Sequence, residues 1–225
     1  MEKLIGTTEA LCRRIAERFP GSGLSKVGDE LLQVARSAAA TSLEIARPNL
    51  VLRGLLLTAF LSLCAVLVYS ARTMQLSFEM ENFGQLIQAV EASFNTIILL
   101  GAFILFLVTI ETRIKRQKAL RALHELRVLS HIVDIHQLTK DPQQTISGEA
   151  RSTASSPQRD MSPFELSRYL DYCSEMLSII SKIAALYAQR FSDSVALDAV
   201  DSIEDLTNGL ARKVWQKIMI LHSIK

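Results

Sequence analysis

Two long stretches without a charged residue constrain this 225-residue chain more than any other feature. The first, GLLLTAFLSLCAVLVYSA, occupies residues 54–71, and the second, ASFNTIILLGAFILFLVTI, occupies residues 92–110. As helices, each would extend for about 27–28 Å, close to the hydrocarbon thickness of a bilayer. A soluble protein could bury one such run as a core helix. Two uninterrupted runs in so short a chain favour a transmembrane helical hairpin.

Lysine and arginine residues gather on one side of these two runs, and they indicate how the hairpin is oriented. Positive charge near membrane spans favours the cytoplasmic side. The connection, residues 72–91, is short and contains three glutamates and one arginine. We therefore expect the connection on the outer side of the membrane and both termini in the cytoplasm. The bases after the second run are expected to contact anionic lipid headgroups, at on the order of 1 kcal/mol each. This basic cluster consists of Arg113, Lys115, Arg116, Lys118 and Arg121.

Neither run contains an acidic, basic or histidine side chain, although proton relays and paths for charged substrates usually need one inside the membrane. Serine and threonine hydroxyls can bond to carbonyls of their own helix, so they need no further partner. The polar residues that stand out are Asn95 and Thr96, near the expected outer end of the second run. We interpret them as a polar contact between helices or, alternatively, as part of a pore lining.

The remaining residues predict an all-α protein, in which the transmembrane hairpin is joined to a cytosolic helical bundle. Residues 141–161 contain one large aliphatic side chain among polar and charged ones, which is typical of a flexible linker. The predicted segments are N-terminal helices at 1–47, a transmembrane hairpin at 48–112 with spans at about 54–71 and 92–110, an extension of the second span at 113–140, the linker at 141–161 and a C-terminal helical hairpin at 162–225.

The N-terminal segment reads as two helices, at about residues 3–19 and 25–46, separated by the helix-breaking sequence FPGSG. Each helix has apolar residues at helical spacing. The first helix could lie in the membrane interface or dock on the rest of the protein, and its pattern fits both.

The C-terminal segment begins with a clear helix start, in which Ser162 is the N-cap, Pro163 the first helical residue and Glu165 the closing residue of a capping box. Apolar residues then recur at alternating intervals of four and three, which predicts packing along a second helix. This packing and interaction seam consists of Leu166, Leu170, Cys173, Leu177, Ile180, Ala184, Tyr187 and Phe191.

The expected partner of that seam is the last helix, at about residues 194–222, folded back as an antiparallel hairpin. Asp193 or Ser194 is the predicted N-cap. Acidic residues come early in this helix and basic residues late, as the helix dipole favours. The dipeptide at 208–209, Asn-Gly, could kink or split the helix.

Three of the four histidines lie in ALHELRVLSHIVDIHQLTKDP, residues 122–142. His124 and His131 are seven residues apart, about 10.5 Å along a helix, so they cannot share one zinc ion at bond lengths of about 2 Å. His131 and Asp134 remain as weak candidate metal ligands. We prefer a solvated or subunit-contacting helix face and expect no metal or other cofactor.

Known catalytic patterns are missing from the sequence: there is no Gly-rich phosphate loop and no HExxH. Cys12, Cys64 and Cys173 lie far apart, which argues against a disulfide framework and a structural zinc site. The balance of 25 basic and 23 acidic residues gives no reason to expect nucleic-acid binding. The sequence therefore favours a protein that is not an enzyme.

Three blocks, HELRVLSHIVDIHQLTKDP, FELSRYLDYCSEML and LARKVWQKIMIL, resemble uncharacterised bacterial two-pass membrane proteins. The resemblance implies the bacterial inner membrane and transfers no functional residue. We expect a membrane-anchored scaffold or regulatory subunit whose partners are the bilayer and either a second copy or an unidentified protein. The alternative is a small oligomeric ion channel or transporter subunit, with the second span lining the pore.

Overall fold

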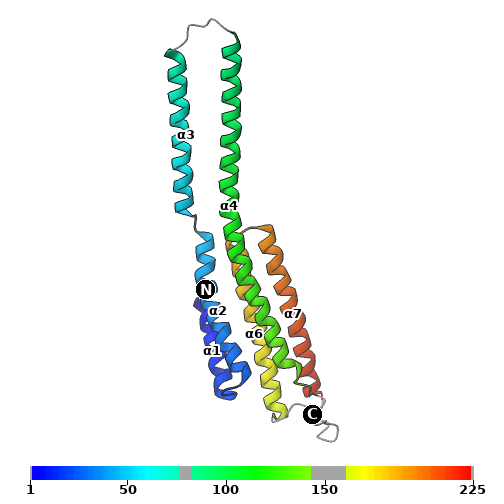
Figure 1. Cartoon of the computed structure of the whole chain (residues 1–225). Helices are drawn as coiled ribbons and strands as arrows, with labels where there is room; N and C mark the ends of the chain where they lie inside the picture. The colour runs from blue at the N-terminus through cyan, green and yellow to red at the C-terminus, as the bar shows by residue number, and fades with distance from the viewer. Residues whose placement is uncertain (1, 77–82, 143–160, 224–225) are drawn as a thin grey trace. The chain divides into compact units, whose positions relative to one another are not determined.

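The computed structural model describes residues 2–76, 83–142 and 161–223, and every element within these ranges is an α-helix, which confirms the all-α class. Most of the predicted linker and the middle of the connection between the two runs lie outside the described residues. The helices are α1 (Glu2–Arg18), α2 (Gly23–Ala46), α3 (Leu50–Leu76), α4 (Phe83–Leu138), α6 (Pro163–Arg190) and α7 (Ser194–His222) (Figure 1).

The chain divides into two compact units, which are described separately. The first contains Met1–Ala46 and Arg116–Lys225, and the second contains Arg47–Lys115. The predicted N-terminal helices are thus part of the same unit as the C-terminal hairpin. Helix α4 contributes residues to both units.

Helices α6 and α7 form the predicted antiparallel hairpin of the first unit (Figure 1). The Ser162 hydroxyl accepts from the Glu165 N–H, and the Glu165 carboxylate accepts in return, which confirms the capping box. Asp193 is the N-cap of α7, since its side chain accepts from Ala196 N–H. Helix α7 continues unbroken through residues 208–209, so the expected kink or split is not observed.

Helix α6 is the central element of this unit, because it contacts α1 and α2 as well as α7. The predicted seam is buried, except that Phe191 is half-buried. A second set of α6 residues, unrecognised in the sequence, is also buried. It consists of Tyr169, Tyr172, Met176, Ile179 and Ile183.

The N-terminal helices dock on α6, which decides between the two alternatives left open by the sequence. The ring of Phe19 meets those of Tyr169 and Tyr172 edge to face, with centroids 5.4 and 6.3 Å apart. At the rim, the Arg14 guanidinium donates to both carboxylate oxygens of Glu175, at 3.1 and 2.6 Å. The hydrophobic side of α1 is therefore covered by protein.

The last part of α4 completes the first unit. It buries one stripe, which includes Leu126, Leu129 and Val133. It runs parallel to α7, because Arg127 Nη2 donates to Ser202 Oγ at 2.7 Å and Lys217 Nζ donates to the carbonyl of Gln137 at 2.6 Å. Together with α1, α2, α6 and α7, it forms one helical bundle around a common core.

The second unit is an antiparallel pair formed by α3 and the first part of α4. At one end, Glu111 accepts from the N–H of Asn49 at 3.3 Å and pairs with Arg53 at 3.6 Å and Lys115 at 2.9 Å. The bond to Lys115, reinforced by that N–H, lowers the pKa of Glu111. These contacts join the start of α3 to α4.

The apolar side chains of this pair stay exposed along its length. They include Leu55, Leu57, Phe94, Ile97 and Leu105. Within the described residues, two helices are long and apolar enough to cross a membrane, and no residue in the most apolar stretch of either helix is buried. The core helix of a soluble protein would instead bury much of such a stretch.

Candidate functional site

Most of the basic cluster is engaged in ion pairs within the protein. Arg116 pairs with Asp193 and Lys118 with Glu44, at 2.7 and 2.6 Å, in addition to the bond between Lys115 and Glu111. Arg113 and Arg121 are exposed and have no acidic partner among the described residues. Three of the five bases of the cluster therefore have an acidic partner within the protein, and the contact of the cluster with lipid headgroups stays a prediction.

The pair formed by Arg116 and Asp193 links α4 to the start of α7. Arg116 donates through Nε and Nη2 to a carboxylate that also caps α7 and is almost fully buried. The hydrogen bonds from Arg116 and the N-terminal N–H groups of α7 hold the pKa of Asp193 below its ordinary value. One carboxylate thus joins two helices at the edge of the bundle.

We expect Asp193→Asn to lower the free energy of unfolding by about 1 kcal/mol, because the amide can still cap α7 but loses the charged pair. The lowered pKa means that the ion pair stabilises the fold above the unfolded pKa of about 3.9 and that this contribution disappears as pH falls through the folded value. Thermal unfolding of the full chain in detergent between pH 2 and 7 measures both effects. Asp198→Asn, at an exposed position of α7, is the matched control, and an equal loss in both variants would contradict the prediction.

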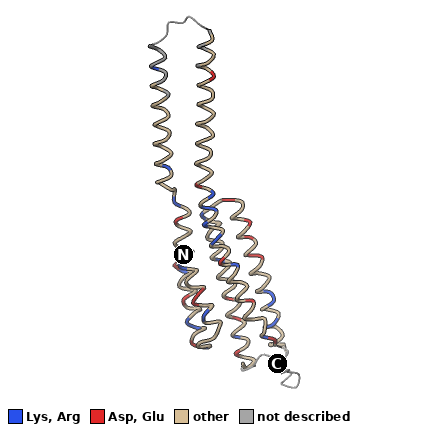
Figure 2. Tube along the Cα trace, in the orientation of Figure 1, with Lys and Arg blue, Asp and Glu red and all other residues tan. Residues whose placement is uncertain are grey.

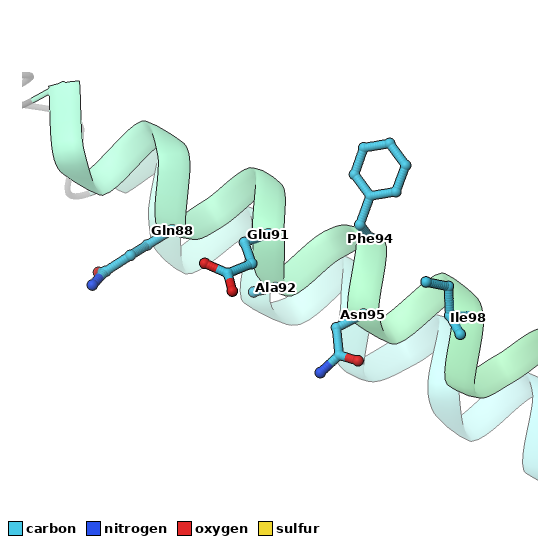
Figure 3. Close-up of a pocket in the computed structure, with 6 residues that line it drawn as sticks. All are labelled: Gln88, Glu91, Ala92, Phe94, Asn95 and Ile98. Carbon is cyan, nitrogen blue, oxygen red and sulfur yellow. The ribbon is translucent and has the colours of Figure 1, made fainter.

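The two polar residues that stand out in the second run, Asn95 and Thr96, have different surroundings. The Thr96 hydroxyl donates to the carbonyl of Ala92 at 2.7 Å, so its own helix satisfies it. Asn95 is exposed and lines an open groove whose described walls all come from α4 (Figure 3). The groove is lined by Gln88, Glu91, Ala92, Phe94, Asn95 and Ile98.

Gln88 and Glu91 were not recognised as site residues in the sequence, because they precede the uncharged run. Their spacing to Asn95, at positions i, i+3 and i+7, is the signal that places all three on one side of a helix.

The histidines do not converge. His124 and His131 are exposed, and His136 packs against Gly23, where a Cβ atom would clash with its ring. The Asp134 carboxylate accepts from the amide of Gln137. Within the described residues no group of three or more histidine, cysteine, aspartate or glutamate side chains is arranged to hold a metal ion.

Two of the cysteines are buried as packing residues. Cys12 Sγ donates to the carbonyl of Gly28 at 3.1 Å. Burial raises the pKa of Cys12 to about 11 and that of Cys173 to about 12. Both thiols therefore stay protonated at neutral pH, and the thiolate needed for nucleophilic attack does not form.

The outer side of α7 presents charge and apolar surface together. Acidic residues occupy its first half and basic residues its second half (Figure 2). Trp215 and Met219, one turn apart, are 55% and 60% exposed, which is unusual for such large apolar side chains. The outer stripe of α7 consists of Asp198, Asp201, Asp205, Arg212, Trp215 and Met219, and all six are exposed.

No protein-family model, no curated protein and no solved structure matches this chain. The resemblance to bacterial membrane proteins, based on three blocks of sequence, stays a prediction.

Proposed function

We propose that this protein is a two-pass membrane protein whose helical bundle binds another protein, and that it acts as a scaffold or regulatory subunit rather than as an enzyme. The observation that carries the proposal is the contrast between the two units. The second unit exposes apolar side chains on nearly every turn, as expected for helices in contact with lipid. The first unit buries a large core and still exposes Trp215 and Met219.

The binding surface proposed here is the outer stripe of α7. The seam residues of α6 are buried in the core of the bundle, so they are not available to bind a partner. The stripe separates acids from bases along one helix, and a parallel copy of α7 would place like charges together. A partner helix that runs antiparallel, or that carries the reverse order of charges, would match it and could cover Trp215.

A photo-crosslinking amino acid in place of Trp215 tests this surface in living cells. The expected result is one dominant adduct that is lost when Asp201 and Asp205 are both changed to lysine. The same amino acid in place of Ser178, exposed on α6, is the control and should give no such adduct. The proposal fails if the two positions give the same products or if neither gives a defined one.

We further propose that both termini lie in the cytoplasm and that the membrane is the bacterial inner membrane. The support is the placement of lysine and arginine residues around the two runs. A membrane-impermeant maleimide should leave Ser178→Cys unlabelled in intact cells and label it after permeabilisation. Labelling in intact cells would reverse the orientation.

A further inference from the structure

Helix α4 carries a polar stripe at the start of its apolar run, made of Gln88, Glu91 and Asn95. In Figure 3 these three side chains point to one side of the helix, and Phe94, one residue before Asn95, points in a different direction. All three are exposed, and none of them hydrogen-bonds within the described part of the chain.

The polar stripe does not face α3. The side of α4 that faces α3 is marked by Glu111, which bonds to Asn49 and Arg53 at the start of α3. Thr96 lies on this same side and is half-buried. Asn95 is one residue away, so its side chain lies about 100° around the helix from that of Thr96. The polar stripe is thus left for a partner outside this pair of helices.

The depth of Asn95 makes an uncovered state of its carboxamide unfavourable. Asn95 lies about 9 Å along the helix from the middle of the run at 92–110, which is about 6 Å inside the edge of a hydrocarbon layer about 30 Å thick. Lipid chains offer no hydrogen bond to its carboxamide, and an unsatisfied amide in hydrocarbon costs several kcal/mol. Glu91 is one turn closer to the surface, and Gln88 is a further turn out.

We propose that the polar stripe is covered by the same stripe of a second copy, in a parallel dimer of α4 helices. Carboxamides are self-complementary, since each one offers both donors and an acceptor. A two-fold axis along the membrane normal therefore pairs Asn95 with Asn95 of the partner subunit, and Gln88 likewise. Parallel pairing is required because both copies insert in the same direction.

The carboxylate of Glu91 opposes dimer formation. In a parallel dimer its carboxylate faces its own copy near the membrane surface, where like charges repel. The dimer is therefore held by Asn95 and Gln88 and weakened by Glu91. An antiparallel pair, or a partner of another sequence, would not be stabilised by Asn95 and Gln88 and at the same time weakened by Glu91.

The inference rests on the proposed membrane insertion, and disulfide trapping tests it separately. In full-length protein in native membranes, with Cys64 changed to alanine, Glu91→Cys should form a covalent dimer under mild oxidation, because it keeps Asn95 and Gln88 and removes the repelling carboxylate. Val90→Cys, at the same depth but about 140° around the helix from Asn95, should form at least tenfold less. Comparable trapping at both positions, or none at Glu91→Cys, overturns the proposal.

The mass of the detergent-extracted protein provides the second measurement. Two copies are expected, and Asn95→Leu should raise the dissociation constant roughly tenfold, because an interhelical amide bond contributes about 1–2 kcal/mol. Glu91→Gln should lower the dissociation constant. A mass that corresponds to a monomer would contradict the dimer. A mass that corresponds to four or more copies would also contradict it and would favour the pore alternative. Protein recovered without detergent would instead refute the membrane proposal itself.

Discussion

Replacing Tyr169 by alanine is expected to lower the free energy of unfolding of the first unit by about 3–5 kcal/mol, the cost typical of removing a buried aromatic ring. The ring is 3% exposed and packs edge to face on Phe19, and Lys140 Nζ lies 5.4 Å from its centroid. Because this ring joins α6 to α1 and to the residues after α4, the cavity should loosen the N-terminal helices first. Amide hydrogen exchange in detergent measures this loss of protection directly.

Tyr169→Phe is the matched control, because it keeps the ring and removes only the hydroxyl. It should retain protection in both N-terminal helices. If Tyr169→Ala leaves exchange in α1 unchanged, the packing of α1 on α6 described here is wrong.

Leu105→Arg is expected to reduce the membrane-inserted fraction of the protein sharply, because an arginine within a membrane span costs about 3 kcal/mol. Leu105 is 69% exposed in the second unit. In water, an exposed leucine could be replaced by arginine with almost no loss of stability. The substitution therefore separates a lipid environment from an aqueous one.

Leu138→Arg is the control for this experiment, since Leu138 lies on the same helix, is 67% exposed and belongs to the first unit. It should leave insertion unchanged. Membrane fractionation with carbonate extraction measures both variants. Equal recovery of the two in the membrane pellet would argue that Leu105 does not lie in lipid.

Local signals in the sequence predicted much of the fold. The capping box at Ser162 and the cap at Asp193 depend on residues within one turn of each other, so they can be recognised without tertiary information. The kink expected at residues 208–209 was wrong because a single glycine costs a helix only about 1 kcal/mol, which packing along α7 easily offsets.

Tertiary contacts were harder to predict. The heptad spacing of α6 revealed one apolar stripe. The second stripe, with its two tyrosines, was not recognised because Phe19, on which both rings pack, lies far earlier in the chain. The ion pairs of the basic cluster were missed for the same reason, since Glu44 and Asp193 are distant in sequence from Lys118 and Arg116. The polar stripe was recognised at Asn95 alone, because Gln88 and Glu91 precede the second uncharged run.

The central position of α6 also has a consequence for biosynthesis. Helices α1 and α2 leave the ribosome long before the α6 surface that they contact, which includes Tyr169 and Tyr172. At typical translation rates of about 5–20 residues per second, their apolar faces wait roughly 6–25 s for the middle of α6. The hairpin of α3 and α4 emerges during that interval. Proteolysis of the nascent chain should therefore be easiest in the first 46 residues until synthesis passes α6.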